Sequence, residues 1–246
     1  MHINVFELFK IGIGPSSSHT VGPMNAAGDF LLELESRNLL EHVGQLHVDL
    51  YGSLALTGKG HATDIAIILG LAGVRPHRVD SDGIGDLISA IREKRSIALL
   101  GRQHIPFLEK QHLRFNMDEF LEQHSNGMKF AAYDSAGTEL FSDTYFSVGG
   151  GFVMTAAALE AGEAARGVNV QVPYDFATAK ELLQMGKASG LSIAEMMMEN
   201  ERCLRSDDEI NQKLDRIWDT MTASIDRGCR EEGKLPGGLN VRRRAA

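Results

Sequence analysis

Hydrophobic positions along the chain follow two different periods. Apolar side chains recur every three or four residues over residues 20–38 and 83–93, which predicts two amphipathic helices. Residues 44–51 alternate between apolar and polar side chains, as in a half-buried strand. Residues 63–71 are almost continuously apolar and predict a buried helix. Helices and strands therefore mix in the first part of the chain.

Strand patterns dominate the middle of the chain. Residues 113–115, 128–133 and 138–148 predict strands, and residues 134–137 predict a hairpin turn between the last two. Three glycines at 149–151 end this region. Because helices and strands do not alternate regularly, the pattern predicts an α+β domain rather than a doubly wound sheet.

The pattern changes after residue 156. Residues 157–172 begin with an Ala-, Glu- and Gly-rich stretch and are interpreted as a linker, whereas residues 173–246 predict only helices. Ser192 with Glu195 predicts a capping box, and Asp207 or Asp208 is expected to cap a long helix. The predicted organisation is an α+β domain over 1–156, a linker over 157–172 and an all-α segment over 173–246.

Composition excludes several classes of protein. The formal net charge of -8 disfavours a nucleic-acid partner, which would need a surplus of Lys and Arg. The sequence contains neither a signal-peptide pattern nor an apolar run long enough for a membrane span, so the cytoplasm is the expected compartment. Two cysteines make no disulfide framework, and we expect Cys203 and Cys229 to be buried thiols. Trp218 and the Met196 to Met198 run are expected in the core.

A hydroxyl-rich segment stands before the first predicted helix. It places Ser16, Ser17, Ser18, His19 and Thr20 between Gly14-Pro15 and Gly22-Pro23. Hydroxyl side chains at this place cap free N–H groups, and such a helix start also suits a carboxylate or phosphate. A histidine there can exchange a proton near neutral pH. The alternative is an ordinary capped helix with an exposed histidine.

A second polar segment follows the strand at 44–51. Gly58 and Gly60 permit close backbone approach to a ligand, and His61, Thr63 and Asp64 stand at the start of the next helix. The glycine spacing is not that of a phosphate loop, and two candidate ligands are too few for a metal site, so we predict no metal here. The alternative is a capped turn between strand and helix.

Four segments together resemble one protein family. They read FKIGIGPSSSHTVGPM at 9–24, YGSLALTGKGH at 51–61, YFSVGGGF at 145–152 and LPGGLNVRRRA at 235–245. In this order they resemble bacterial single-chain iron–sulfur L-serine dehydratases: a whole N-terminal β domain, then the truncated start of the α catalytic domain. Ala62 departs from the glycine usual in the family, and a methyl group disfavours a positive φ.

The resemblance implies conversion of L-serine to pyruvate and ammonia in amino-acid catabolism and gluconeogenesis. It implies a [4Fe-4S] cluster that acts as a Lewis acid on the substrate hydroxyl, no pyridoxal phosphate, and a cytoplasmic homodimer with neither a nucleic-acid nor a membrane partner. The family's cluster cysteines are expected beyond residue 246. The 246-residue chain alone is therefore expected to lack the cluster and to be inactive.

The resemblance also suggests roles for the two polar segments. His19 and His61 are the candidates for proton transfer, and the two segments are expected to converge on one cleft. Ser16, Ser17, Ser18 and Thr20 would hold the substrate carboxylate, while Thr63 and Asp64 would orient His61 or bind the amine. The alternative function is a regulatory, dimerising module that binds a small molecule, like the allosteric substrate-binding domain of phosphoglycerate dehydrogenases. A purely structural interaction domain is a third possibility.

Overall fold

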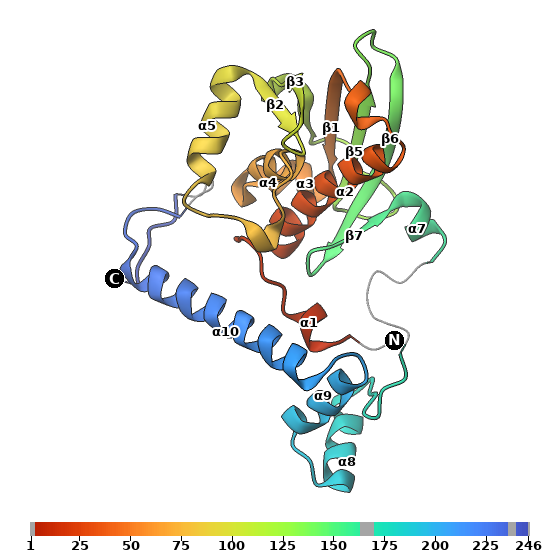
Figure 1. Ribbon diagram of the computed structural model, residues 1–246, viewed down its shortest axis with the longest axis vertical. Coiled ribbons are helices and arrows are strands. Elements are labelled where there is room, and N and C mark those ends of the chain that lie inside the picture. The colour runs from red at the N-terminus through yellow and green to blue at the C-terminus, as the bar shows by residue number, and fades with distance from the viewer. Residues whose placement is uncertain (1–2, 163–169, 236–239, 246) are drawn as a thin grey trace. The chain divides into compact units, whose positions relative to one another are not determined.

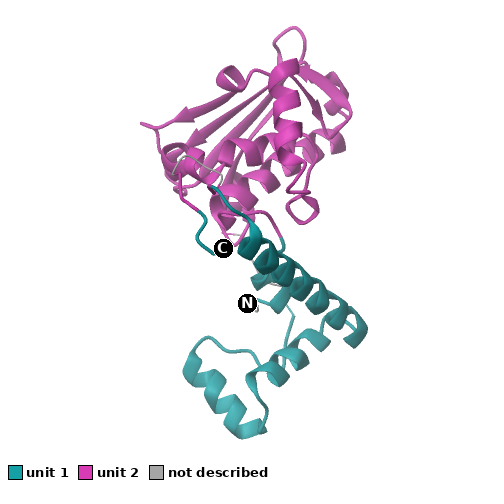
Figure 2. Cartoon of the chain, turned by 90° about the vertical axis from the view of Figure 1, so that its left-hand side faces the viewer, with its two compact units in different colours: residues 1–11, 166–233, 243–246 teal, residues 12–165, 234–242 magenta. Residues whose placement is uncertain are grey.

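The computed structural model describes residues 3–162, 170–235 and 240–245. The chain divides into two compact units (Figure 2). The α/β unit consists of Gly12–Ala165 with Lys234–Arg242, and the helical unit consists of Met1–Ile11, Arg166–Gly233 and Arg243–Ala246. Residues 163–169 of the predicted linker, and 236–239 of the fourth family segment, lie outside the described residues.

The α/β unit is built on a five-stranded mixed sheet (Figure 1). Its strands, in spatial order, are β4 (Leu113–Asn116), β1 (Gln45–Tyr51), β5 (Gly127–Tyr133), β6 (Glu139–Gly149) and β7 (Phe152–Thr155). β1 and β4 are parallel, and the other neighbouring pairs are antiparallel. A separate antiparallel hairpin joins β2 (Ser96–Leu99) to β3 (Gln103–Pro106). The α+β prediction is confirmed.

Helices accompany this sheet. They are η1 (Ser17–Val21), α2 (Gly22–Ser36), η2 (Leu40–His42), α3 (Gly52–Thr57), η3 (Gly58–His61), α4 (Thr63–Leu71), η4 (Pro76–Arg78), α5 (Ile84–Lys94), α6 (Glu109–His112) and α7 (Ala156–Glu160). The core lies between α2 and the sheet, where the ring of Phe30 stacks on that of Phe130 with centroids 5.3 Å apart. Both rings are fully buried.

α2 and α4 pack against each other at very short range. A Cβ at Gly70 would overlap the carbonyl oxygen of Met24 and lie 2.8 Å from the Cβ of Ala27. Glycine at this position therefore lets the two backbones touch. The relative position of the two helices is fixed by this contact; α2 begins just after the first predicted polar segment, and α4 begins within the second.

Several predicted elements match the structure and others do not. α4 covers the predicted residues 63–71, and the turn at 134–137 closes through a hydrogen bond from Asp134 N to Thr138 O. Residues 52–57 form α3, a helix that was not predicted. The β2–β3 hairpin and β7 were not predicted, because strands of four residues show too little alternation to be distinguished from loops.

The helical unit contains α1 (Val5–Leu8), α8 (Ala179–Ser189), α9 (Ile193–Arg202) and α10 (Asp207–Arg230). The Ser192–Glu195 capping box of α9 is confirmed. α10 is capped by Ser206, whose side chain accepts from Glu209 N, and not by Asp207 or Asp208 as predicted. Within the described residues, none of the helices is both long enough and apolar enough to cross a membrane.

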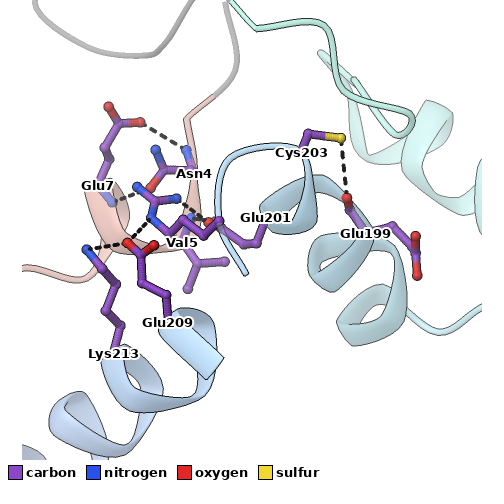
Figure 3. Close-up of polar contacts among 9 residues, drawn as sticks. Asn4, Val5, Glu7, Glu199, Glu201, Cys203, Glu209 and Lys213 are labelled. Carbon is purple, nitrogen blue, oxygen red and sulfur yellow. Dashed lines mark hydrogen bonds and ion pairs between the residues drawn. The ribbon is translucent and has the colours of Figure 1, made fainter. Parts of the chain in front are cut away.

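A buried carboxylate ties α1 to α9 and to the turn that follows α9 within the helical unit (Figure 3). Glu201 is 3% exposed; its Oε1 accepts from Val5 N at 2.6 Å and its Oε2 accepts from Arg205 Nη1 at 2.6 Å. The guanidinium of Arg205 also lies over the ring of Phe6, 5.1 Å from its centroid. A buried carboxylate with both oxygens satisfied is a specific anchor, so the first residues belong to the helical unit.

Three side chains expected in the interior lie on the surface instead. Trp218 is 67% exposed, and both Cys203 and Cys229 are exposed. Helical periodicity identifies the apolar face of a helix but does not show whether another element covers it, which explains these errors. Met196 is buried, as predicted, whereas Met197 and Met198 are half-buried.

Candidate functional site

His19 lies in an unusual backbone turn. η1 is a π-helix, a rare form that occurs mostly as single turns and often at functional sites. Ser16 caps this turn, because its Oγ accepts from His19 N at 3.2 Å. α2 continues directly from the turn, so the imidazole of His19 is held by a rigid helix start rather than by a mobile loop.

His61 lies at the end of η3, and its ring has a fixed tautomer. Its Nδ1 is 2.9 Å from the carbonyl oxygen of Thr57. A carbonyl only accepts hydrogen bonds, so Nδ1 must carry the proton and the neutral ring has its lone pair on Nε2. Nε2 has no hydrogen-bond partner among the described residues. His61 is therefore arranged as a proton acceptor.

The two histidines meet, as the sequence predicts. Their ring centroids are 4.8 Å apart and the ring planes are tilted by 41°. Residues 16–20 and 58–64 thus converge on one place in the α/β unit, as predicted, whereas a cleft between them stays a prediction. The alternative of two unrelated capped turns does not explain this proximity.

Hydroxyl groups surround the ring of His19. Its Nδ1 lies 2.9 Å from Ser18 Oγ and its Nε2 lies 3.0 Å from Ser53 Oγ. Ser18 Oγ is in turn 3.4 Å from Ser16 Oγ. Both ring nitrogens of His19 are therefore occupied, and a chain of hydroxyls extends from one of them.

Ser53 is the site residue that sequence reasoning did not assign. It follows Gly52, whose φ of +54° places it in the left-handed region that favours glycine. A Cβ at Gly52 would also overlap the carbonyl oxygen of Ser125. The signal was a Gly-Ser pair after a strand, because such a glycine permits the sharp turn that directs the next side chain toward the site.

The environment favours the neutral form of His19. Burial lowers its pKa, and the nearby His61 lowers that pKa further when His61 is charged. Both effects follow from the cost of placing charge in a desolvated space and beside a like charge. A charge on both rings at the same time is therefore disfavoured.

Two predicted substrate ligands donate hydrogen bonds to the backbone. Thr20 Oγ1 donates to the carbonyl oxygen of His61 at 2.9 Å, and Thr63 Oγ1 donates to the carbonyl oxygen of His19 at 2.5 Å. Thr20 is 3% exposed and Thr63 is fully buried. Both buried hydroxyls therefore bond to the backbone of the other polar segment, and their role in binding the substrate stays a prediction.

The remaining predicted residues differ in their surroundings. Ser17 is exposed, and no hydrogen bond of its hydroxyl occurs among the described residues. Asp64 Oδ1 accepts from Ile65 N at 2.9 Å, and burial raises the pKa of this carboxyl, as does the nearby Glu109. Within the described chain Asp64 makes no hydrogen bond or ion pair to either histidine, and its role in binding an amine stays a prediction.

The glycine run at residues 149–151, in the third family segment, packs against the start of α2. Gly149, Gly150 and Gly151 have φ angles of +95°, +62° and +76°, so three consecutive residues need the conformational freedom of glycine. Asn25 Nδ2 donates to Gly151 O at 3.0 Å, which holds this turn to α2. The glycine run therefore forms the turn between β6 and β7 that packs behind the start of α2.

The two cysteines do not provide a cluster site. The Cys203 thiol donates to Glu199 O at 3.5 Å, within its own helix, and Cys229 lies near the end of α10. Among the residues that the structure describes, no group of three or more His, Cys, Asp or Glu side chains could hold a metal ion. A four-iron cluster bound by cysteines does not fit these residues.

Comparison with known proteins decides the family. Residues 4–158 match the family model of the serine dehydratase beta chain, and residues 188–246 match that of the serine dehydratase alpha chain. The chain belongs to the serine dehydratase family. The beta-chain match covers both histidines, the hydroxyl groups around them and the glycine run. The family resemblance noted from the sequence is thus confirmed.

Serine dehydratases of several bacteria are similar to this chain. The L-serine dehydratase of Streptomyces coelicolor is 47% identical over 246 residues, covering 100% of this chain and 54% of that protein. L-serine dehydratase TdcG of Escherichia coli is 49% identical over 244 residues, covering 99% and 53%, and the Haemophilus influenzae enzyme is 44% identical over 245 residues, covering 99% and 53%. The chain spans about half the length of these relatives.

Proposed function

We propose that this chain supplies the proton-transfer groups of an L-serine dehydratase, which converts L-serine to pyruvate and ammonia. The observation that carries the proposal is the free Nε2 lone pair of His61 beside a neutral His19. An imidazole nitrogen with a free lone pair can accept a proton from a bound substrate. The family supports the choice of substrate, since its relatives are named for L-serine.

The proposed reaction begins with proton transfer to His61 Nε2. The Cα–H bond of serine breaks, its electron pair forms the Cα–Cβ double bond, and the Cβ–O bond breaks as hydroxide leaves and takes up a proton from the hydroxyl chain beside His19, which is replenished by solvent water. The aminoacrylate becomes an imine, and water then releases ammonia and pyruvate. His61 keeps its orientation throughout, because its other nitrogen donates to Thr57 O.

His19 has a different task in this proposal. Both of its ring nitrogens already bond to hydroxyl groups, those of Ser18 and Ser53. It therefore acts through the hydroxyl chain, which can pass a proton toward the leaving group. We assign the substrate carboxylate to Ser16, Ser17 and Ser18, among which the exposed Ser17 hydroxyl is free of described partners.

The complete protein is proposed to be a cytoplasmic homodimer that carries a [4Fe-4S] cluster. The family resemblance supports these statements. The described residues supply no ligand set for the cluster. The alternative, a regulatory module like that of phosphoglycerate dehydrogenases, is less well supported, because the chain matches both serine dehydratase models.

His61→Asn in the complete protein tests this function. Asparagine keeps a donor near the place of Nδ1 but has nothing at the place of Nε2. Turnover of L-serine should fall by about 10²- to 10⁴-fold, the usual contribution of a general base, while serine binding is retained. His104→Asn, at an exposed position of β3, is the matched control. Full turnover by His61→Asn would refute the proposal, and loss of binding with unchanged turnover per bound serine would favour the regulatory module.

A further inference from the structure

We infer that Thr20 and Thr63 form a reciprocal clasp that fixes the separation of His19 and His61, and that both are positioning residues. The clasp is defined by two hydrogen bonds: Thr20 Oγ1 to His61 O, and Thr63 Oγ1 to His19 O. The consequence of the clasp for catalysis rests on the function proposed above, whereas the two hydrogen bonds themselves do not depend on that function.

The two bonds cross between the polar segments. Thr20 follows His19 in the chain and bonds to the carbonyl of His61, whereas Thr63 stands two residues after His61 and bonds to the carbonyl of His19. Each bond therefore ends on the backbone of a histidine. A change in either bond moves a histidine Cα directly, and the imidazole moves with it.

The backbone N–H of Ser16 helps to determine that Thr20 Oγ1 is the donor in its hydrogen bond to His61 O. The backbone N–H of Ser16 donates to Thr20 Oγ1 at 3.3 Å. A hydroxyl has one proton to give, and a carbonyl cannot donate, so that proton goes to His61 O. Thr20 thus links the cap of the π-helix to the second segment, while keeping every bond of its hydroxyl inside the protein.

Burial makes these bonds costly to lose. Thr20 is 3% exposed and Thr63 is fully buried, so water cannot replace either donor in the folded protein. The local sequence also makes room for the clasp. A Cβ at Gly58 would lie 3.0 Å from Thr63 Oγ1 and 3.1 Å from Thr63 Cβ. Glycine at 58 is therefore explained by the space that Thr63 needs.

Thr20→Val and Thr63→Val remove the hydroxyls with little change in volume. Both variants are studied in the 246-residue chain by long-range ¹H–¹⁵N NMR of the imidazoles and by NOEs between the two rings. Thr57→Val is the matched control, because Thr57 Oγ1 donates to Ser53 O at 2.8 Å within α3 and bridges no segments. None of these readouts depends on turnover, so they are independent of the proposed reaction.

We expect both clasp variants to lose the ring-to-ring NOEs and to raise the pKa of His19 toward the ordinary value of about 6.5. Thr57→Val should keep both properties. The double variant should show little further change, because either broken bond already releases the segments. Thr20→Ser and Thr63→Ser keep the hydroxyl, so these variants should retain the ring-to-ring NOEs and the low pKa of His19.

Three results would overturn the clasp. The first is a folded Thr20→Val or Thr63→Val chain with unchanged NOEs and His19 titration. The second is an additive double variant, which would show two independent bonds. If the valine variants do not fold, the serine variants decide: a folded serine variant that loses the ring contact would show that the methyl group, not the hydroxyl, holds the histidines.

Discussion

His61 Nδ1 donates a hydrogen bond to the carbonyl oxygen of Thr57, 2.9 Å away, and this bond determines which nitrogen of the ring can act as a base. The carbonyl belongs to the last residue of α3, so the donor and its acceptor lie in one continuous stretch of α3 and η3. The local backbone of α3 and η3 therefore sets the orientation of the His61 ring. The other histidine, His19, reaches it from a distant part of the sequence.

Ala62 occupies a backbone conformation that favours glycine. Its φ of +55° and ψ of 35° lie in the left-handed region, just before α4. That region costs a residue with a side chain about 1–2 kcal/mol, whereas glycine adds unfolded-state freedom worth about 0.4–1 kcal/mol. We therefore expect Ala62→Gly to raise the free energy of unfolding by up to about 1 kcal/mol, measured by urea denaturation.

Ala72, at the other end of α4, is the matched control for that substitution. Its φ is -73°, in the right-handed region, so glycine brings no relief of strain there. Ala72→Gly should lower the free energy of unfolding by about 0.5–1 kcal/mol. Equal destabilisation by both substitutions would contradict the left-handed conformation of Ala62.

Gly22 has no room for a side chain. A Cβ there would overlap Ser147 Oγ and lie 2.8 Å from Ser147 Cβ, and Ser147 is fully buried. Gly22→Ala should therefore destabilise the chain by about 1–3 kcal/mol, as overpacking does, and should displace the π-helix that holds His19. Thermal unfolding and the His19 imidazole signals report the two effects.

Gly85, in α5, has room for a side chain and serves as the control for Gly22→Ala. Nothing lies within 4 Å of a Cβ at this position, so Gly85→Ala should stabilise the helix by about 0.5–1 kcal/mol.

Adding Ser147→Gly to Gly22→Ala should recover part of the lost stability. If Gly22→Ala is as stable as the parent chain, the close packing of α2 on β6 is wrong.

Stability should fall as the pH drops below about 6.5, the ordinary value for histidine. Burial lowers the pKa of His19, His47 and His112. The folded state then binds fewer protons than the unfolded state between the lowered pKa and 6.5, so each histidine removes up to about 1.4 kcal/mol per pH unit in that interval. Above 6.5 the three make no contribution. Urea denaturation between pH 7.5 and 5.5 measures the slope.

His47→Gln isolates one of these histidines. Its ring faces His112, Tyr133, Arg114 and Asp49, and the variant should make the slope shallower. Asp64 and Asp143 have raised pKa values and act in the opposite sense, but they are common to parent and variant. An unaltered slope in His47→Gln would contradict the assignment.

Long elements with a clear period were predictable from the sequence. α4 matches its prediction, and β1 starts one residue later than expected, because both have an unbroken pattern. α3 was missed, since six residues that begin with a positive-φ glycine do not reveal a helical period. The π-helix was missed for a related reason: one extra residue in a single turn leaves the spacing of α2 intact.

The candidate site was partly predictable. The sequence indicated that His19 and His61 act together, because each stands among hydroxyl residues before a helix. The roles of Thr20, Thr63 and Ser53 could not be inferred, because the acceptor of a hydroxyl depends on how two distant segments pack. The close contact of α2 with α4 at Gly70 decides that packing, and it follows from tertiary structure rather than from any local pattern.

The tautomer of His61 is the most direct test of this account. Long-range ¹H–¹⁵N NMR of the 246-residue chain at neutral pH distinguishes a protonated Nδ1 from a protonated Nε2. We predict the Nδ1–H form for His61, with Nε2 showing the shift of an unprotonated nitrogen, and NOEs from its ring to that of His19. An Nε2–H form, or two rings without NOEs, would contradict the proposal that His61 Nε2 is the base of this site.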